Sequence, residues 1–218
     1  LLITFVLFSC EDKKKDDTVS VTDIDGNVYS IVKIGNQVWM AENLRVTKYR
    51  NGDTISDYSA YDDIQSNAEI YGYLYGWDAV KDNRNIAPEG WHVPTDEEWM
   101  ELEQALGMNS AQANSRGYRG TNEASKLAGN ADLWDDDELI SDSEFGASGF
   151  NALPGGFRSG SSRSFGQFSL MGVLALFWSS TPMSNYGIWG RTLLYSDIRV
   201  RRGDMHIKGR ISIRCVKD

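Results

Sequence analysis

The strongest local signal in the chain is a helix start, Pro94-Thr95-Asp96-Glu97-Glu98-Trp99. The Thr95 side chain can accept a hydrogen bond from the backbone of Glu98, while the Glu98 carboxylate returns to the backbone of Thr95, as in a capping box. The acidic residues of this first turn also suit the positive end of a helix dipole. Apolar residues then fall on one helix face and Gly107 ends the pattern, which predicts a short amphipathic helix.

Most of the chain outside this helix has the pattern of β-strands. Residues 19–43 contain many β-formers and are interrupted by Asp25-Gly26-Asn27 and Gly35-Asn36, which are hairpin-turn sequences. The aromatic segment 70–80 predicts a strand that turns into a short helix, and 123–128 predicts a second helix. From residue 145 onward, short apolar pieces alternate with Gly and Ser at hairpin spacing. Because the helices come early and the strands late, the order predicts an α+β fold.

The composition is that of one globular domain, or two small ones, with a negative net charge. The chain has 218 residues, 41% of them hydrophobic, and 31 acidic against 22 basic residues give a net charge of −9. Such a surface repels phosphate backbones, so nucleic acid is not an expected partner. Residues 53–104 hold 13 acidic and two basic residues, whereas 191–218 hold eight basic and three acidic ones. We expect these blocks to pair with each other, and a cationic ligand or a basic partner is the alternative.

The first ten residues are mostly apolar and end in Cys10. The segment is too short to span a bilayer, which takes about 20 residues, and it is typical of the end of a signal-peptide apolar region. Leu7-Phe8-Ser9-Cys10 resembles a relaxed bacterial lipobox, which implies cleavage before Cys10 and lipid, including palmitate, on that residue. Residues 1–9 are therefore expected to be a truncated lipoprotein signal peptide, with the leader residues before Leu1 missing.

Residues 10–20 are polar and charged, which predicts a flexible tether between the lipidated Cys10 and a domain at 21–218. The run Lys15-Asp16-Asp17 resembles the acidic export signal of Bacteroidetes surface lipoproteins. That resemblance implies a lipid-anchored protein on the cell surface of the outer membrane, and a linker on the periplasmic face is the alternative. With Cys10 lipidated, Cys215 is the single remaining thiol, and its apolar neighbours favour a buried, inert side chain.

Six segments occur in a fixed order: 35–44 (GNQVWMAENL), 71–77 (YGYLYGW), 87–99 (APEGWHVPTDEEW), 149–158 (GFNALPGGFR), 177–181 (FWSST) and 212–218 (SIRCVKD). Together they resemble the Fibrobacter succinogenes major paralogous domain over about residues 23–218. The resemblance implies a C-type-lectin-like fold, shared with formylglycine-generating enzymes. That fold would place two short helices on small twisted antiparallel sheets with long irregular loops. It also implies a Bacteroidetes or Fibrobacteres protein, often a lipoprotein.

The residues offer little for catalysis, so we expect no enzymatic activity. Formylglycine-generating enzymes use paired cysteines near the C-terminus, where this chain has Cys215 alone. His92 and His206 are too few for a transition-metal site, which takes three or four ligands, and His92 is expected to be packed or hydrogen-bonded. Ser179 and Ser180 lack the Gly-x-Ser-x-Gly motif of a nucleophile, and no phosphate-binding loop is present.

No cofactor is expected. Asp135, Asp136 and Asp137 could offer oxygen ligands to calcium. Their segment lacks the glycine and the spaced acids of an EF-hand loop, and the sugar-binding triplets of C-type lectins are also absent. A solvated acidic loop is therefore favoured over a calcium site.

Aromatic and loop residues are the remaining signal for binding. Tyr and Trp make good contacts with sugar faces and protein surfaces, so Trp77, Tyr186 and Trp189 are candidates, together with Arg158 in a Gly/Ser/Arg-rich loop. Core packing is the competing interpretation of the aromatics. We expect a cell-envelope lipoprotein with a non-catalytic binding domain for an extracellular glycan or an envelope protein. The alternatives are a carbohydrate-active enzyme and a structural envelope component without a small ligand.

Overall fold

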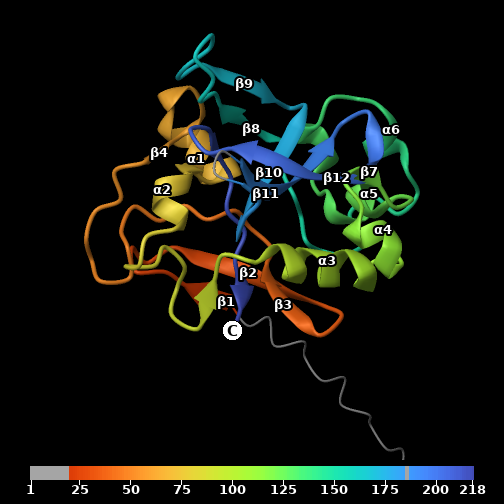
Figure 1. The fold of residues 1–218 in the computed structure, drawn as a ribbon, viewed down its shortest axis with the longest axis horizontal. Coiled ribbons are helices and arrows are strands. Elements are labelled where there is room, and N and C mark those ends of the chain that lie inside the picture. The colour runs from red at the N-terminus through yellow and green to blue at the C-terminus, as the bar shows by residue number, and fades with distance from the viewer. Residues whose placement is uncertain (1–19, 185–186) are drawn as a thin grey trace, which may run out of the picture.

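A computed structural model describes residues 20–184 and 187–218, which form three small antiparallel sheets (Figure 1). The first, β1-β2-β3-β14-β6, consists of Ser20–Thr22, Val28–Ile34, Gln37–Met40, Val216–Lys217 and Trp91–His92. The second, β10-β11-β12-β7, consists of Leu174–Pro182, Gly187–Leu194, Asp197–His206 and Gly117–Arg119. The third, β4-β5-β13-β8-β9, consists of Tyr58–Ser59, Leu74–Gly76, Arg210–Ile211, Gly155–Arg158 and Phe168–Met171. The α+β prediction is therefore confirmed.

The described residues contain more helices than the expected two. The α-helices are α1 (Gln65–Tyr71), α2 (Trp77–Val80), α3 (Asp96–Ala105), α4 (Ser110–Asn114), α5 (Glu123–Leu127) and α6 (Glu138–Ser141). Short 3₁₀ turns lie at Tyr61–Asp63 (η1) and Ala131–Leu133 (η2). The helices expected after Thr95 and over 123–128 are α3 and α5, and the strand that turns into a helix is β5 followed by α2. Figure 1 shows α3 to α6 gathered on one side of the molecule.

Local sequence determines α3 and the first hairpins as expected. The Glu98 backbone donates to Thr95 Oγ1 at 3.2 Å, and the Thr95 backbone donates to Glu98 Oε2 at 2.7 Å, so the capping box is complete. Gly26 and Gly35 form the turns of the β1-β2-β3 meander at φ +86° and +59°, which glycine adopts without strain. The described part of the chain opens with β1, whose first residue is Ser20, and the expected domain boundary at 21 stays a prediction.

Arg214, in the segment before β14, joins three distant parts of the chain inside the core. Its guanidinium is fully buried and donates to Asn43 Oδ1 at 3.1 and 2.6 Å. It also donates to the carbonyls of Met40, Phe150 and Asn151. Burial lowers the pKa of Arg214 to about 9. Segments that resemble the family in sequence thus meet at this side chain, which gives them a structural role.

A second buried set of charges, the ion network, connects α3 with the sheet β10-β11-β12-β7. Arg191 donates to Asp96 Oδ1 at 2.7 Å and to Glu103 Oε1 at 2.6 Å. Arg202 donates to Asp96 Oδ2 at 2.5 Å, and Arg119 donates to Glu103 Oε2 at 2.5 Å. All five side chains are buried. Burial raises the pKa of Asp96, but the hydrogen bonds and charges of Arg202 and Arg191 outweigh it and hold that pKa below its usual range.

The ion network confirms the expected pairing of the two charge blocks. Asp96 and Glu103 belong to the acidic block, and Arg191 and Arg202 belong to the basic one. The blocks also meet at the sheet β4-β5-β13-β8-β9, where Arg210 Nε lies 2.7 Å from Asp57 Oδ1. Ion pairs between residues far apart in sequence therefore connect α3 to the sheet β10-β11-β12-β7 and β13 to the loop that contains Asp57.

Substituting Glu103→Gln should lower the free energy of unfolding by about 3–5 kcal/mol, because it leaves buried guanidinium groups without a counter-charge. Urea denaturation monitored by tryptophan fluorescence measures this change. Glu101→Gln is the matched control, since Glu101 is exposed on the same helix and should change stability by no more than about 0.5 kcal/mol. Equal effects of the two substitutions would contradict the role given to the ion network.

Candidate functional site

The best candidate for a binding site is a cavity of about 440 Å³ on one face of the sheet β10-β11-β12-β7. We call it the apolar pocket, because apolar side chains dominate its walls. β10 contributes Leu174, Leu176 and Trp178, which share a face because side chains alternate along a strand. Phe157 of β8 and Ile211 of β13 form the opposite wall. The volume lies within the range of about 300–1,000 Å³ that is usual for ligand sites.

Strand register determines which side chains reach the apolar pocket. Leu176 lies opposite Thr192, Thr192 opposite Arg201, and Arg201 opposite Tyr118, so one row crosses all four strands. All four side chains line the pocket. The next row, Phe177, Arg191, Arg202 and Gly117, points to the other face, where the ion network lies. Consecutive residues such as Arg201 and Arg202 therefore serve opposite faces of the sheet.

The rim of the apolar pocket carries polar side chains that are available to a ligand. The side chains of Arg201 and Asp204 form no hydrogen bond or ion pair with any other residue that the structure describes. His206 is exposed, and its Nδ1 accepts a hydrogen bond from the Lys208 backbone at 3.2 Å. An apolar interior with a few convergent polar groups is the usual composition of a binding site.

A neighbouring cavity of about 340 Å³, the basic pocket, is lined by Arg158, Lys208, Arg210, Asp57 and Phe165, among others. Arg210 is paired with Asp57, and Arg158 donates to the Gly166 carbonyl at 3.0 Å. Lys208 forms no side-chain hydrogen bond or ion pair within the described part of the chain. Arg158, a predicted binding residue, thus lies in a pocket, together with part of the loop that follows it.

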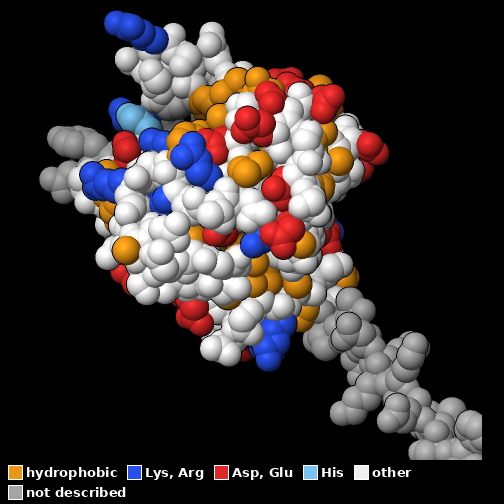
Figure 2. All heavy atoms as spheres, turned by 90° about the vertical axis from the view of Figure 1, so that its right-hand side faces the viewer, with side chains coloured by type: hydrophobic (Ala, Val, Ile, Leu, Met, Phe, Trp, Pro, Cys, Tyr) orange, Lys and Arg blue, Asp and Glu red, His pale blue; other side chains and the backbone are white. Residues whose placement is uncertain are grey.

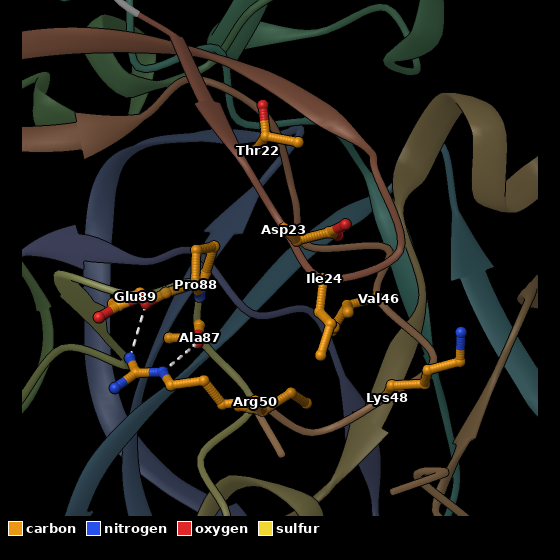
Figure 3. Close-up of a pocket in the computed structure, with 10 residues that line it drawn as sticks. Thr22, Asp23, Ile24, Val46, Lys48, Arg50, Ala87, Pro88 and Glu89 are labelled. Atoms are coloured by element: carbon orange, nitrogen blue, oxygen red, sulfur yellow. Dashed lines mark hydrogen bonds between the residues drawn. The ribbon is translucent and has the colours of Figure 1, made fainter. Parts of the chain in front are cut away.

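A third cavity, of about 260 Å³, has polar groups that are already committed to structure (Figure 3). Arg50 donates to the carbonyls of Ala87 at 3.1 Å and Pro88 at 2.6 Å. The carboxylate of Asp23 accepts hydrogen bonds from the turn that follows it and from the Tyr29 hydroxyl at 2.6 Å. Lys48 Nζ lies 3.1 Å from Asp25 Oδ1. These groups hold loops together, which leaves the cavity less suited to a ligand.

Trp77 and Trp189, two of the predicted aromatic binding residues, are engaged in contacts with other side chains of the protein. Of the two interpretations open for Trp77, core packing applies, because its side chain is 9% exposed and packs on Trp178 with ring centroids 5.8 Å apart. Trp189 is partly buried, and the guanidinium groups of Arg202 and Arg116 lie 3.8 and 4.8 Å from its ring. Tyr186 lies outside the described residues. Core packing accounts for Trp77, and cation–π stacking occupies Trp189.

The three aspartates considered for calcium line neither the apolar pocket nor the basic pocket. Asp135 and Asp136 are exposed, and Asp137 caps α6 by accepting from the Glu138 backbone at 2.8 Å. The calcium hypothesis stays a prediction. Cys10 lies outside the described residues. Cys215 is fully buried, as expected, and burial raises the pKa of its thiol to about 12.

The serine and histidine groups considered for catalysis are bound into the structure. Ser179 donates to the Trp189 carbonyl at 2.9 Å, and Thr181 accepts from the Asp96 backbone at 3.0 Å. Ser180 and His92 line one small cavity. Both ring nitrogens of His92 contact carboxylates, Nδ1 at 2.6 Å from Asp218 Oδ1 and Nε2 at 2.7 Å from Glu98 Oε1. Neither nitrogen is directed at Ser180 as a general base would be.

The pocket residues Tyr118, Leu174, Leu176 and Arg201 were not singled out from the sequence. The alternation Leu174-x-Leu176-x-Trp178 was the available signal, because it places three apolar side chains on one strand face. It does not tell which other strands share that face, since this depends on register between segments far apart in the chain.

Comparison with known proteins gives one match. The model of the Fibrobacter succinogenes major domain matches residues 32–217. No curated protein and no solved structure matches the chain. Within residues 20–184 and 187–218, no helix has the length and apolar character needed to cross a membrane.

The bridge made by His92 predicts a pH dependence of stability. Burial lowers the pKa of His92, but the hydrogen bonds and charges of Asp218 and Glu98 outweigh it and raise that pKa above its usual 6.5. Protonated His92 therefore stabilises the fold below about pH 6.5, and this contribution is lost as the pH rises through the raised pKa. The melting temperature of the wild type should exceed that of His92→Gln by more at pH 6 than at pH 9. An equal difference at both pH values would contradict the bridge.

Proposed function

The chain belongs to the Fibrobacter succinogenes major domain family, and we propose that it is a non-catalytic binding domain of the cell envelope. The observation that supports this proposal is the apolar pocket itself. Its cavity of about 440 Å³ is open at a rim where Arg201 and Asp204 have no partner among the described residues. Such a preformed cavity can accept an apolar group while its rim orients the rest of a ligand.

The lining of the pocket favours an envelope protein over a glycan as the ligand. Leu174, Leu176 and Ile211 are aliphatic, and Trp178 is fully buried behind them. Sugars are held by stacking on exposed aromatic rings and by dense hydrogen bonding. The apolar pocket has one such exposed ring, Tyr118, and its walls are otherwise mainly apolar with few hydrogen-bonding groups. It therefore suits an apolar side chain presented by another polypeptide, which acts as an anchor in many protein interfaces.

The N-terminal sequence supports a proposal about the position of the protein in the cell envelope. We propose that Cys10 carries the lipid and that the domain, from Ser20 onward, lies on the outer membrane, on the cell surface or the periplasmic side. Small antiparallel sheets, short helices and long connections are also what a C-type-lectin-like fold requires, and we propose that finer assignment.

Closing the mouth of the apolar pocket should abolish binding. Ser161 is exposed and lines the pocket, whereas its neighbour Ser162 is exposed and does not. On an array of randomised peptides, Ser161→Trp should weaken binding by about tenfold or more, which corresponds to about 1.4 kcal/mol. Ser162→Trp is the matched control and should bind like the wild type.

Loss of binding in both variants, or in neither, would contradict the proposed site. A glycan array probed with the same three proteins tests the other ligand class. If one class of sugar bound to the wild type and to Ser162→Trp but not to Ser161→Trp, the ligand would be a glycan and not a protein. Turnover of labelled polysaccharide by the wild type would contradict the non-catalytic role.

The lipid anchor makes a separate prediction about Cys10. Expressed in a bacterium with a complete lipoprotein leader, the wild type should fractionate with membranes, and Cys10→Ser should not, because stable anchoring requires buried acyl chains. Mass spectrometry of the N-terminal peptide should show an acylated Cys10 as the first residue. An unmodified Cys10 still joined to Ser9 would contradict the anchor.

A further inference from the structure

The apolar pocket and the basic pocket lie on opposite faces of two neighbouring strands, β8 and β13, inside the sheet β4-β5-β13-β8-β9. We call this strand pair the ribbon. Arg158 and Arg210 are directly paired in this ribbon, and both line the basic pocket. Their neighbours Phe157 and Ile211 line the apolar pocket. This is the alternation that a β-strand imposes on consecutive side chains. The ribbon therefore separates an apolar compartment from a cationic one.

The two compartments meet at the end of the ribbon, which we call the crest (residues 158–160 and 208–210). Ser159 lines both pockets. A Cβ atom at Gly160 would collide with the carbonyl of Lys208, so the two segments of the crest touch through their backbones. The loop beyond the crest is closed by hydrogen bonds between the backbones of Gly166 and Ser159, at 2.8 Å, and between the hydroxyls of Ser159 and Ser164, at 2.7 Å. The crest is thus a preformed surface.

Positive charge at the crest exceeds what the neighbouring carboxylates neutralise. Asp57 is paired with Arg210, and Asp63 Oδ1 lies 3.9 Å from Arg158 Nη1. Lys208 has no such counter-charge among the described residues, and at the rim of the apolar pocket the side chains of Arg201 and Asp204 are both without an ion-pair partner there. Figure 2 shows several Lys and Arg side chains near a histidine on one side of the view, with a few acidic side chains among them and more acidic side chains on the other side. On a chain with net charge −9, this local surplus selects for anions.

We propose that the crest is the recognition site for an acidic protein segment, whose apolar side chain enters the apolar pocket and whose carboxylates pair with Lys208 and Arg158. The inference rests on the proposed function, which supplies the apolar anchor. An extended polypeptide fits two compartments on opposite faces, because its successive side chains diverge. The exposed ring of Phe165, 73% accessible at the edge of the basic pocket, offers further apolar contact.

Three pools of randomised fluorescent peptides test this proposal, each with a central Leu or Phe flanked by Glu, Gln or Lys. Measured by fluorescence anisotropy with the full chain in 0.05 M salt, the Glu pool should bind with an affinity about tenfold higher than that of the Gln pool. The advantage should vanish in 0.5 M salt, because screening then acts over a few ångströms. Lys208→Glu should remove the preference for the Glu pool and leave binding of the Gln pool unchanged.

Lys33→Glu is the matched control, since it makes the same charge change at an exposed position of β2 and should keep the preference. Equal binding of the Glu and Gln pools to the wild type, both weakened by Ser161→Trp, would overturn the acidic segment and leave the proposed function standing. Absence of binding in all pools would overturn both. Binding of anionic lipid vesicles that depends on Lys208, without a preference among peptides, would assign the crest to a membrane and overturn the proposal.

Discussion

The ion network between α3 and the sheet β10-β11-β12-β7 is the constraint on which the rest of the structure depends. Asp96 and Glu103 on the helix hold Arg191, Arg202 and Arg119 on three different strands. A buried charge without a partner costs several kcal/mol, so each strand has one favoured position along the helix. A shift of one residue in β12 would turn Arg202 out of the core and put Gly203 or Arg201 in its place.

This fixed register produces the pocket on the opposite face. Because side chains alternate, placing Arg191 and Arg202 in the core places Thr192 and Arg201 toward the apolar pocket. Trp189 contributes to the same arrangement, since its ring stacks on the guanidinium of Arg202 at 3.8 Å. Trp189, which the sequence suggested as a binding residue, therefore stabilises β12, the strand that places Arg201 at the rim of the apolar pocket. The charged core and the candidate site are two faces of one sheet.

Local sequence was sufficient for elements whose signals are local. Thr95 and Glu98 predicted the start of α3, and the glycine turns predicted the β1-β2-β3 meander. The uneven charge also predicted that distant blocks pair. By contrast, α1 has no side-chain cap and spans seven residues, so it lacks a start signal and forms through packing. The sequence left Trp77 open between binding and core packing, because its burial on Trp178 is a contact between residues far apart in the chain. The apolar pocket could not be predicted, because its walls come from six strands and from the loops at 159–161 and 207–209.

The central claim is that a ligand of this chain binds at the apolar pocket and the crest. Amide chemical shifts of the isotope-labelled full chain, followed by NMR during titration with the Glu-flanked peptides, test it most directly. The account predicts that shifts change at 157–161, 174–178 and 201–211 and stay constant at 22–24, 46–50 and 86–89, around the third cavity. Changes confined to that third cavity, or spread evenly over all three sheets, would contradict it.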